Sequence, residues 1–157
     1  MSWKAQHLNL KFLKMKISLL EAINEVIDVA NDNLDNIVDV RYVVSEEDID
    51  INKSKNFPAL FIMLTTPSTI NDSFNVANIT LYFLDASTSQ NNEIEKDLNI
   101  KSDLFQQASI LLDRLQLLGS IETVNSSLEP FSGRFNNGLS GWTTSLSINI
   151  KKPCYNV

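Results

Sequence analysis

The strongest hydrophobic pattern in the chain lies between Phe57 and Asp85, where a polar stretch separates two apolar segments. The first segment, Phe57–Leu64, is apolar almost without interruption, which is typical of a strand covered on both faces. The second, Val76–Leu84, alternates between two faces. Branched and aromatic residues dominate both segments, and turn formers fill the gap. The pattern predicts two antiparallel central strands joined by a long loop at 65–75.

Two other segments carry apolar residues at the three- and four-residue spacing that predicts an amphipathic helix. The first runs from Ile17 to Leu34. Ser18 and Glu21 at its start form the pattern of a capping box, in which each side chain bonds the backbone of the other residue. The second segment runs from Glu93 to Leu118, and the following Gly119 is suited to end a helix.

Three further segments show the alternation of strands. Residues 36–45 have one apolar face and one mixed face, which suits a strand at or near a sheet edge. Residues 120–124 form a short candidate strand, and residues 141–150 alternate with one polar face, as a half-buried strand does. The remaining stretches, 85–92 and 125–140, are predicted to be long connecting loops.

The order of these elements is α-β-β-β-α-β-β. It predicts an α+β fold, in which two helices pack on one face of a mainly antiparallel sheet. No internal repeat or linker interrupts the pattern, so residues 17–157 are expected to form a single domain. At 157 residues the chain is long enough to bury a real core. Its hydrophobic fraction of 43% and charged fraction of 20% are those of an ordinary globular protein.

Residues 1–16 form a basic and partly apolar lead ahead of that domain. The lead carries four lysines and no acidic residue, whereas the segment that follows is dense in Glu and Asp. Leu8, Leu10 and Phe12 alternate with polar residues, so both a short strand and a loosely ordered terminus remain open. A segment with this many large apolar groups, Trp3 among them, can also dock on a neighbouring subunit.

Charge and cysteine content narrow the functional classes. The formal net charge of −6 argues against a general affinity for nucleic acid, which requires a basic surface. The single cysteine, Cys154, excludes an internal disulfide and a thiolate metal cluster. Lysines and Asn9 interrupt the apolar run at 8–20, which makes it too polar for a signal peptide or a membrane-spanning helix. We therefore expect cytosolic synthesis and no membrane partner.

The best candidate for a metal site is the acidic stretch between Asp48 and Asn56, which offers oxygen ligands at alternate positions as an EF-hand loop does. Lys53 stands where that loop needs glycine for a sharp turn, and Ala59 stands where a bidentate glutamate closes the site. Both mismatches fall at diagnostic positions. The stretch is therefore interpreted as a solvated acidic loop, and no cofactor is expected.

Catalytic chemistry has little support in the sequence. Nucleophilic catalysis needs a nucleophile, a base and a group that orients the base. The single histidine, His7, lies in the lead, and Cys154 lies near the other end of the chain. No serine stands in a Gly-x-Ser-x-Gly elbow, and four glycines in total leave no glycine-rich phosphate loop. We predict that the protein is not an enzyme.

Aromatic residues and predicted edge strands provide candidate positions for protein contacts. Exposed aromatic side chains are typical anchors of interfaces. The strand at 36–45 and the last strand are candidates for pairing with the sheet edge of another subunit. Simple solvent exposure is the alternative for the loops near them. The predicted interface residues are Trp3, Phe12, Arg41, Tyr42, Phe131, Phe135 and Trp142.

Several features together resemble the tail-terminator and tail-completion proteins of tailed bacteriophages. They are the acidic helix at 17–34, the Asn-Phe-Pro entry to the central strand at 56–58, the Tyr-Phe-Leu-Asp end of the next strand at 82–85, and the long helix closed by Gly119. The C-terminal sequence GWTTSLSINIKKPCYNV is also similar to the C-terminal ends of such proteins from phages of Bacteroidetes hosts. The resemblance covers residues 17–154, and the lead has no counterpart in it.

The resemblance implies a virion protein that is assembled in the host cytoplasm and forms a ring, usually a hexamer, at the head-proximal end of the tail. Such a ring stops polymerisation of the tail-tube protein and presents a surface to neck and connector proteins. The genome DNA would pass through its lumen without specific binding. The acidic balance of the chain suits that passage, because negative groups repel phosphate.

Other functions remain open beside the tail terminator. One is another neck or connector ring protein of the same fold. A second is a monomeric adaptor module that binds proteins, and a small hydrolase is the third. Ring formation separates the first two, and a titration with divalent metal that follows thermal stability tests the third.

Overall fold

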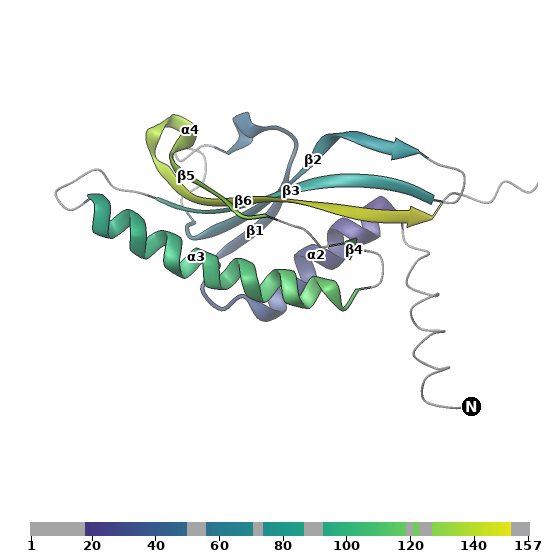
Figure 1. The fold of residues 1–157 in the computed structure, drawn as a ribbon, viewed down its shortest axis with the longest axis horizontal. Coiled ribbons are helices and arrows are strands. Elements are labelled where there is room, and N and C mark those ends of the chain that lie inside the picture. The colour runs from purple at the N-terminus through teal and green to yellow at the C-terminus, as the bar shows by residue number, and fades with distance from the viewer. Residues whose placement is uncertain are drawn as a thin grey trace, which may run out of the picture.

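Two helices pack on one face of a six-stranded, mainly antiparallel sheet in the computed structural model (Figure 1). This arrangement confirms the predicted α+β class. The model describes residues 18–49, 56–70, 74–86, 93–118, 121–122 and 127–151. The predicted lead at 1–16 lies outside the described residues.

Both predicted helices are present. Helix α2 spans Leu19–Asn33, and its capping box is formed as predicted: the Ser18 hydroxyl accepts a hydrogen bond from the Glu21 backbone N–H at 3.2 Å, and the Glu21 carboxylate accepts one from the Ser18 N–H at 2.9 Å. These two bonds satisfy backbone donors that the first helical turn leaves without partners. Helix α3 spans Glu93–Gln116. The predicted stop at Gly119 lies outside the described residues.

The sheet has the strand order β1-β2-β3-β6-β4, with β5 also paired to β6. Strand β1 is parallel to β2, and the other pairs are antiparallel. The edge position predicted for the strand at 36–45 is therefore confirmed. The chain passes from β1 to β2 through a short 3-10 turn, η1 (Glu46–Asp48). The strands are β1 (Asp39–Val43), β2 (Ala59–Ile70), β3 (Phe74–Ala86), β4 (Ile121–Glu122), β5 (Glu129–Gly133) and β6 (Leu139–Lys151).

The predicted loop at 65–75 is wrong, because β2 continues to Ile70 and β3 begins at Phe74. The two strands change register between Thr65 and Thr69. Pro67 lies inside that irregularity and has no backbone N–H for the ladder, so a break in regular pairing accommodates it. Polar residues at the ends of these two long strands resemble a loop in composition.

The predicted connector at 125–140 also contains regular structure that its composition did not reveal. Strand β5 pairs with β6 through Glu129, Pro130 and Phe131, and the short helix α4 (Arg134–Asn137) follows. Gly133 joins them at φ +63°, a left-handed conformation that glycine adopts without a steric penalty. In the predicted loop at 85–92, the first two residues belong to β3 and the rest lie outside the described residues.

Apolar layers cover both faces of the sheet. On the helix side, α2 and α3 pack against alternate residues of β2, β3 and β6, such as Leu60, Phe83 and Leu146. On the other side, residues from the β1–β2 crossover and the β5–α4 segment cover the remaining set, including Phe61 and Leu84. Residues 59–62 are at most 1% exposed, which confirms that this strand is covered on both faces.

Within the described residues, the helices do not reach the combination of length and apolar content that crossing a membrane requires.

Candidate interaction surfaces

One end of the sheet carries large apolar side chains in solvent. Val38, Tyr42 and Val44 are 66%, 40% and 78% exposed along β1. Their neighbour Val40 packs against the helix-side core. We call residues 38–44 the β1 edge. Among the described strands, β2 is the one that pairs with β1, so the outer side of β1 is open within that part of the chain.

The backbone direction of the β1 edge follows from one hydrogen bond. The Val38 N–H donates to the Pro58 carbonyl at 2.8 Å, on the side of β2. Backbone N–H groups of successive strand residues point to opposite edges. The N–H groups of Asp39, Arg41 and Val43 therefore point away from β2, where a further strand could pair with them.

Arg41 contributes charge and packing within its own subunit. Its guanidinium forms an ion pair with Asp39 and lies 5.6 Å from the centre of the Phe61 ring. Arg41 is the single basic residue in the sequence between Ser18 and Ile49. The end of the sheet that holds α2, β1 and η1 is therefore built from acidic segments.

Three residues clamp the β1–β2 crossover onto the face of the sheet that lies opposite the helices. The Tyr82 hydroxyl donates to the Glu46 carboxylate at 2.8 Å, and Arg134 lies 3.5 Å from the same oxygen. Burial and the hydrogen bond to Glu46 raise the pKa of Tyr82 to about 12. The hydroxyl therefore stays protonated and serves as a donor over the ordinary pH range.

Phe131 and Phe135 pack beside this clamp, and the expectation that both are exposed aromatics is wrong. Phe131 is 7% exposed and Phe135 is partly buried. The Phe135 ring meets Tyr82 and Phe131 edge to face, with ring centres 5.7 Å apart in each pair. Arg134 covers Phe135 at 5.3 Å. Within the monomer, these residues pack the sheet face opposite the helices.

The side of the sheet opposite β1 carries a shallow apolar groove of about 430 Å³ between α3, β5 and β6. We call it the α3–β5 groove. Leu98 and Phe105, which are 66% and 45% exposed, form its helical wall. Ile94, one turn before Leu98 on α3, is 87% exposed and extends the apolar strip. The residues lining the groove are Leu98, Lys101, Ser102, Phe105, Gln106, Pro130 and Trp142.

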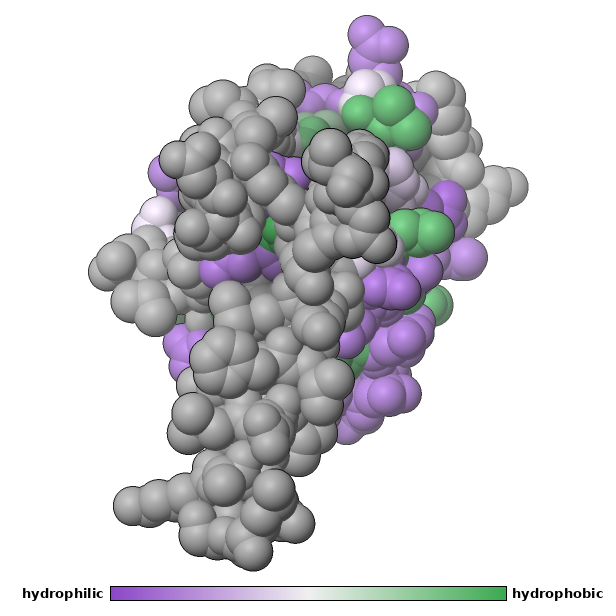
Figure 2. All heavy atoms as spheres, turned by 90° about the vertical axis from the view of Figure 1, so that its right-hand side faces the viewer, coloured by the Kyte–Doolittle hydropathy of each residue, from purple (hydrophilic) through white to green (hydrophobic). Residues whose placement is uncertain are grey.

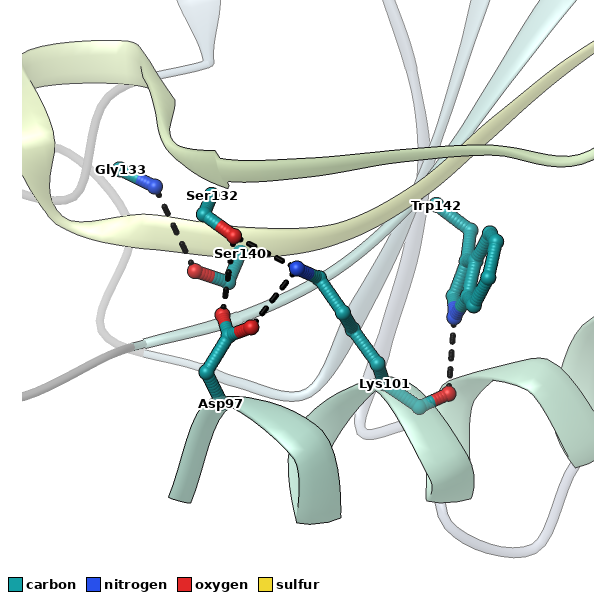
Figure 3. A network of polar contacts seen from close by, with 6 residues as sticks. All are labelled: Asp97, Lys101, Ser132, Gly133, Ser140 and Trp142. Carbon is teal, nitrogen blue, oxygen red and sulfur yellow. Dashed lines mark hydrogen bonds and ion pairs between the residues drawn. The ribbon is translucent and has the colours of Figure 1, made fainter. Parts of the chain in front are cut away.

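Trp142 fixes the floor of the groove. Its indole N–H donates to the Lys101 carbonyl at 2.8 Å (Figure 3). The Trp142 ring also meets Phe105, with ring centres 5.3 Å apart. The remainder of the ring packs against the helix-side core. Of the predicted interface residues, Trp142 is thus partly internal, and part of its surface lines the groove.

A polar network beside the groove joins α3 to the last two strands (Figure 3). The Lys101 ammonium donates to Asp97 at 2.7 Å and to the Ser132 hydroxyl at 2.6 Å, and Ser132 in turn donates to Asp97 at 3.1 Å. Burial alone would raise the pKa of Asp97, but hydrogen bonds from Lys101, Ser132 and Ser140 outweigh it and lower the pKa. Sequence reasoning missed this network, although the i,i+4 spacing of Asp97 and Lys101 was a usable signal.

On the face shown in Figure 2, apolar side chains form separate patches among hydrophilic residues wherever the described atoms are visible. Scattered single apolar residues are normal on protein surfaces. The β1 edge and the α3–β5 groove each bring several exposed apolar residues together, so they are the candidate contact regions.

Several predicted positions fall outside the residues that the structure describes. These are Trp3 and Phe12 of the lead, and residues 50–55 of the acidic stretch. At the start of that stretch, the Asp48 carboxylate accepts hydrogen bonds from the backbone N–H groups of Val44 and Ser45, each at 3.1 Å. The described part of the chain brings together no group of three metal-ligating side chains.

The fold defines the class of this protein: an α+β domain with two helices on one face of a mainly antiparallel sheet. A comparison with family models and with curated proteins found no match to this chain.

Proposed function

We propose that this protein is a ring-forming structural subunit of a phage tail, which ends growth of the tail tube at its head-proximal end and joins the tail to the neck. The observation that carries the proposal is the pair of unlike apolar surfaces at opposite ends of one sheet, the β1 edge and the α3–β5 groove.

Unlike surfaces favour head-to-tail assembly. A two-fold dimer uses the same patch on both subunits, whereas a ring joins one patch to a different patch on the next subunit. The β1 edge presents exposed side chains such as Tyr42, and the α3–β5 groove is concave and apolar. An exposed apolar edge that enters a concave apolar groove removes both surfaces from water. Repetition of that contact generates a ring if the rotation closes.

The resemblance to tail-terminator proteins supplies the location and the partners. In that setting one rim of the ring meets the last layer of tail-tube subunits, and the other rim meets neck or connector proteins. The copy number expected from the resemblance is six.

The charge of the chain fits a channel for DNA. The net charge of −6 leaves the protein with little attraction for phosphate groups. DNA can then slide through the lumen without being held. Purified protein is expected to show no tight, salt-dependent binding to duplex DNA. Such binding would argue against a lumen through which DNA passes freely.

A monomeric protein-binding adaptor is the second candidate, because a single apolar groove can also hold one segment of a partner. The two functions differ in what covers the β1 edge. An adaptor leaves that edge exposed in its working state, whereas a ring subunit buries it.

The functional test is growth of tail tubes in the presence of this protein. The tail-tube protein of the same phage is polymerised alone and then with the wild-type chain at one ring per tube end. We expect tubes that stop growing and carry a ring at one end in negative-stain images. Tubes of unchanged length without end rings would contradict the proposal.

Two variants separate the groove from general surface effects. Leu98→Glu places a charge in the α3–β5 groove and is expected to abolish capping, because burying an unpaired carboxylate is unfavourable. Leu117→Glu is the matched control, since Leu117 is 71% exposed just after α3 and does not line the groove. Loss of capping in both variants would remove the groove from the account.

A further inference from the structure

We propose that residues 8–12 of the lead add as an extra strand to the β1 edge of a neighbouring copy. The inference rests on the proposed function for one point only, which is that the neighbour is the next subunit of the ring. The added strand pairs with the outer backbone groups of β1, whereas the exposed side chains of the β1 edge are the part assigned to the α3–β5 groove. Strand addition to an exposed sheet edge is a general mode of recognition, in which backbone hydrogen bonds give affinity and alternate side chains give specificity.

The edge offers the backbone groups that such a strand needs. The N–H groups of Asp39, Arg41 and Val43 point away from β2, as the Val38–Pro58 hydrogen bond establishes. Open backbone groups on an edge strand are a ready template for pairing with another chain.

The side chains of the two segments match face by face. On β1, Val40 packs against the helix-side core, and Tyr42, two residues further along the strand, stands on the same face. Leu8, Leu10 and Phe12 occupy one face of an extended lead, and Asn9 and Lys11 occupy the other. Pairing in this phase places apolar residues beside apolar residues, which is where neighbouring strands gain stability. The opposite phase would set Lys11 against the helix-side core.

Charge favours the same partner. The lead carries Lys4, Lys11, Lys14 and Lys16 and no acidic residue. The segments around the β1 edge hold acidic residues with Arg41 as their one base, and Asp39 already forms an ion pair with that guanidinium. Opposite charges across a contact speed association and fix its register. The contact is therefore expected to weaken as salt is added.

An extended lead would reach further than the length of its own helix α2. An extended chain spans about 3.3 Å per residue, so the segment from Leu8 to Ser18 reaches roughly 33 Å from the start of α2. Helix α2, with 15 residues, is itself only about 22 Å long. The lead can thus extend well past its own helix and lie along the edge of an adjacent copy.

Cross-linking of mixed full-length chains tests whether the contact forms between copies. Cys154→Ser supplies a background without thiols. One chain then carries Lys11→Cys and a second, differently tagged chain carries Arg41→Cys, which stand on the same face in the proposed pairing. A short bis-maleimide tolerates a register shift of two residues. We expect the yield of the cross-linked heterodimer, which carries both tags, to exceed the yield of either homodimer at least tenfold.

Leu10→Pro in the lead chain removes a backbone donor from the centre of the added strand and is expected to abolish this product. Ser2→Pro is the matched control, because it introduces the same residue outside the paired segment. Cross-linking that survives Leu10→Pro would overturn strand addition. So would a chain with both cysteines that cross-links only to itself, at a yield independent of concentration.

Amide exchange of β1 separates failure of this inference from failure of the ring. We expect the N–H groups of Asp39, Arg41 and Val43 to exchange about tenfold more slowly in the wild-type assembly than in Leu10→Pro. Rings of normal mass with identical β1 exchange in both chains would overturn strand addition and leave the ring intact. A wild-type chain that stays monomeric at every concentration would overturn both.

Discussion

The indole of Trp142 on β6 donates a hydrogen bond of 2.8 Å to the backbone carbonyl of Lys101 on α3. This bond ties the long helix to the sheet at the place where the α3–β5 groove opens. Lys101 then extends its ammonium to Asp97 and Ser132, so one residue links helix, strand and groove. The wall of the proposed contact surface is thus held by the same interactions that stabilise the monomer.

Trp142→Phe is expected to lower the free energy of unfolding by about 1–2 kcal/mol, because the Lys101 carbonyl loses a partner in a half-buried position. Trp142→Ala is expected to lower it by roughly 3 kcal/mol or more, since packing against Phe105 and the core is lost as well. Urea unfolding followed by circular dichroism measures both. Unchanged stability combined with lost assembly would instead make Trp142 purely an interface residue.

Gly141→Ala is expected to be among the most damaging small substitutions in the chain. A Cβ at this position would overlap the backbone carbonyl oxygen of Phe83 in the adjacent strand. The backbones must separate, and we expect a loss of at least about 3 kcal/mol or failure to fold. Soluble yield and thermal unfolding measure the effect.

Gly133→Ala is the matched control for Gly141→Ala. A Cβ at Gly133 meets nothing within 4 Å, but the φ of +63° strains an alanine, so a loss of only about 1 kcal/mol is expected. Gly133→Asn should recover part of it, because asparagine tolerates this region. Equal losses at both glycines would show that close approach of β3 and β6 is not the cause.

Tyr82→Phe is expected to change the alkaline end of the stability profile. Because the pKa of Tyr82 is about 12 in the fold against 10.0 for an ordinary tyrosine, the folded state holds its proton more tightly than the unfolded chain. This contribution is fully present below pH 10 and is lost as pH rises towards 12. Between pH 8 and 12, the free energy of unfolding should fall less steeply with pH in Tyr82→Phe than in the wild type.

At neutral pH the same variant should lose about 1 kcal/mol with its hydrogen bond to Glu46. A wild-type slope in Tyr82→Phe would contradict the role assigned to the clamp.

Asp97→Asn is expected to change the dependence of stability on pH in the acid range. The pKa of Asp97 is lowered in the fold, so its ionised form adds stability that is present above the ordinary aspartate pKa and is lost as pH falls through the lowered value. The variant should be less stable at pH 7 and lose less on acidification. Asp113→Asn, an exposed change on the same helix, is the control for the loss of one negative charge, and chemical unfolding from pH 7 to pH 2.5 compares the two variants.

The elements that could be predicted from the sequence are those in which the spacing of apolar residues follows a buried face. The spacing in α2 and the Ser18–Glu21 capping pattern are local, so they can be read without knowing the partners. The apolar run at 57–64 likewise implied cover on both faces, and residues 59–62 have it. The fold class follows from these elements and their order.

What the sequence did not reveal depends on contacts between distant segments. Strand β5 contains proline and ends at glycine, which are turn formers, and it exists because it pairs with β6. The burial of Phe131 requires α4 and the β1–β2 crossover to close over the sheet, so the sequence around Phe131 does not reveal it. The α3–β5 groove needs α3, β5 and β6 together, and periodicity in any one of them carries no trace of it.

The measurement that tests the central claim most directly is the mass of the purified chain by light scattering on a sizing column, with negative-stain images of the main peak. We expect closed rings for the wild type. Tyr42→Glu and Leu98→Glu should each be monomeric, and mixing the two should give a dimer and nothing larger, because one intact edge then meets one intact groove. A wild-type monomer at every concentration, or rings in both variants, would contradict head-to-tail assembly through these surfaces.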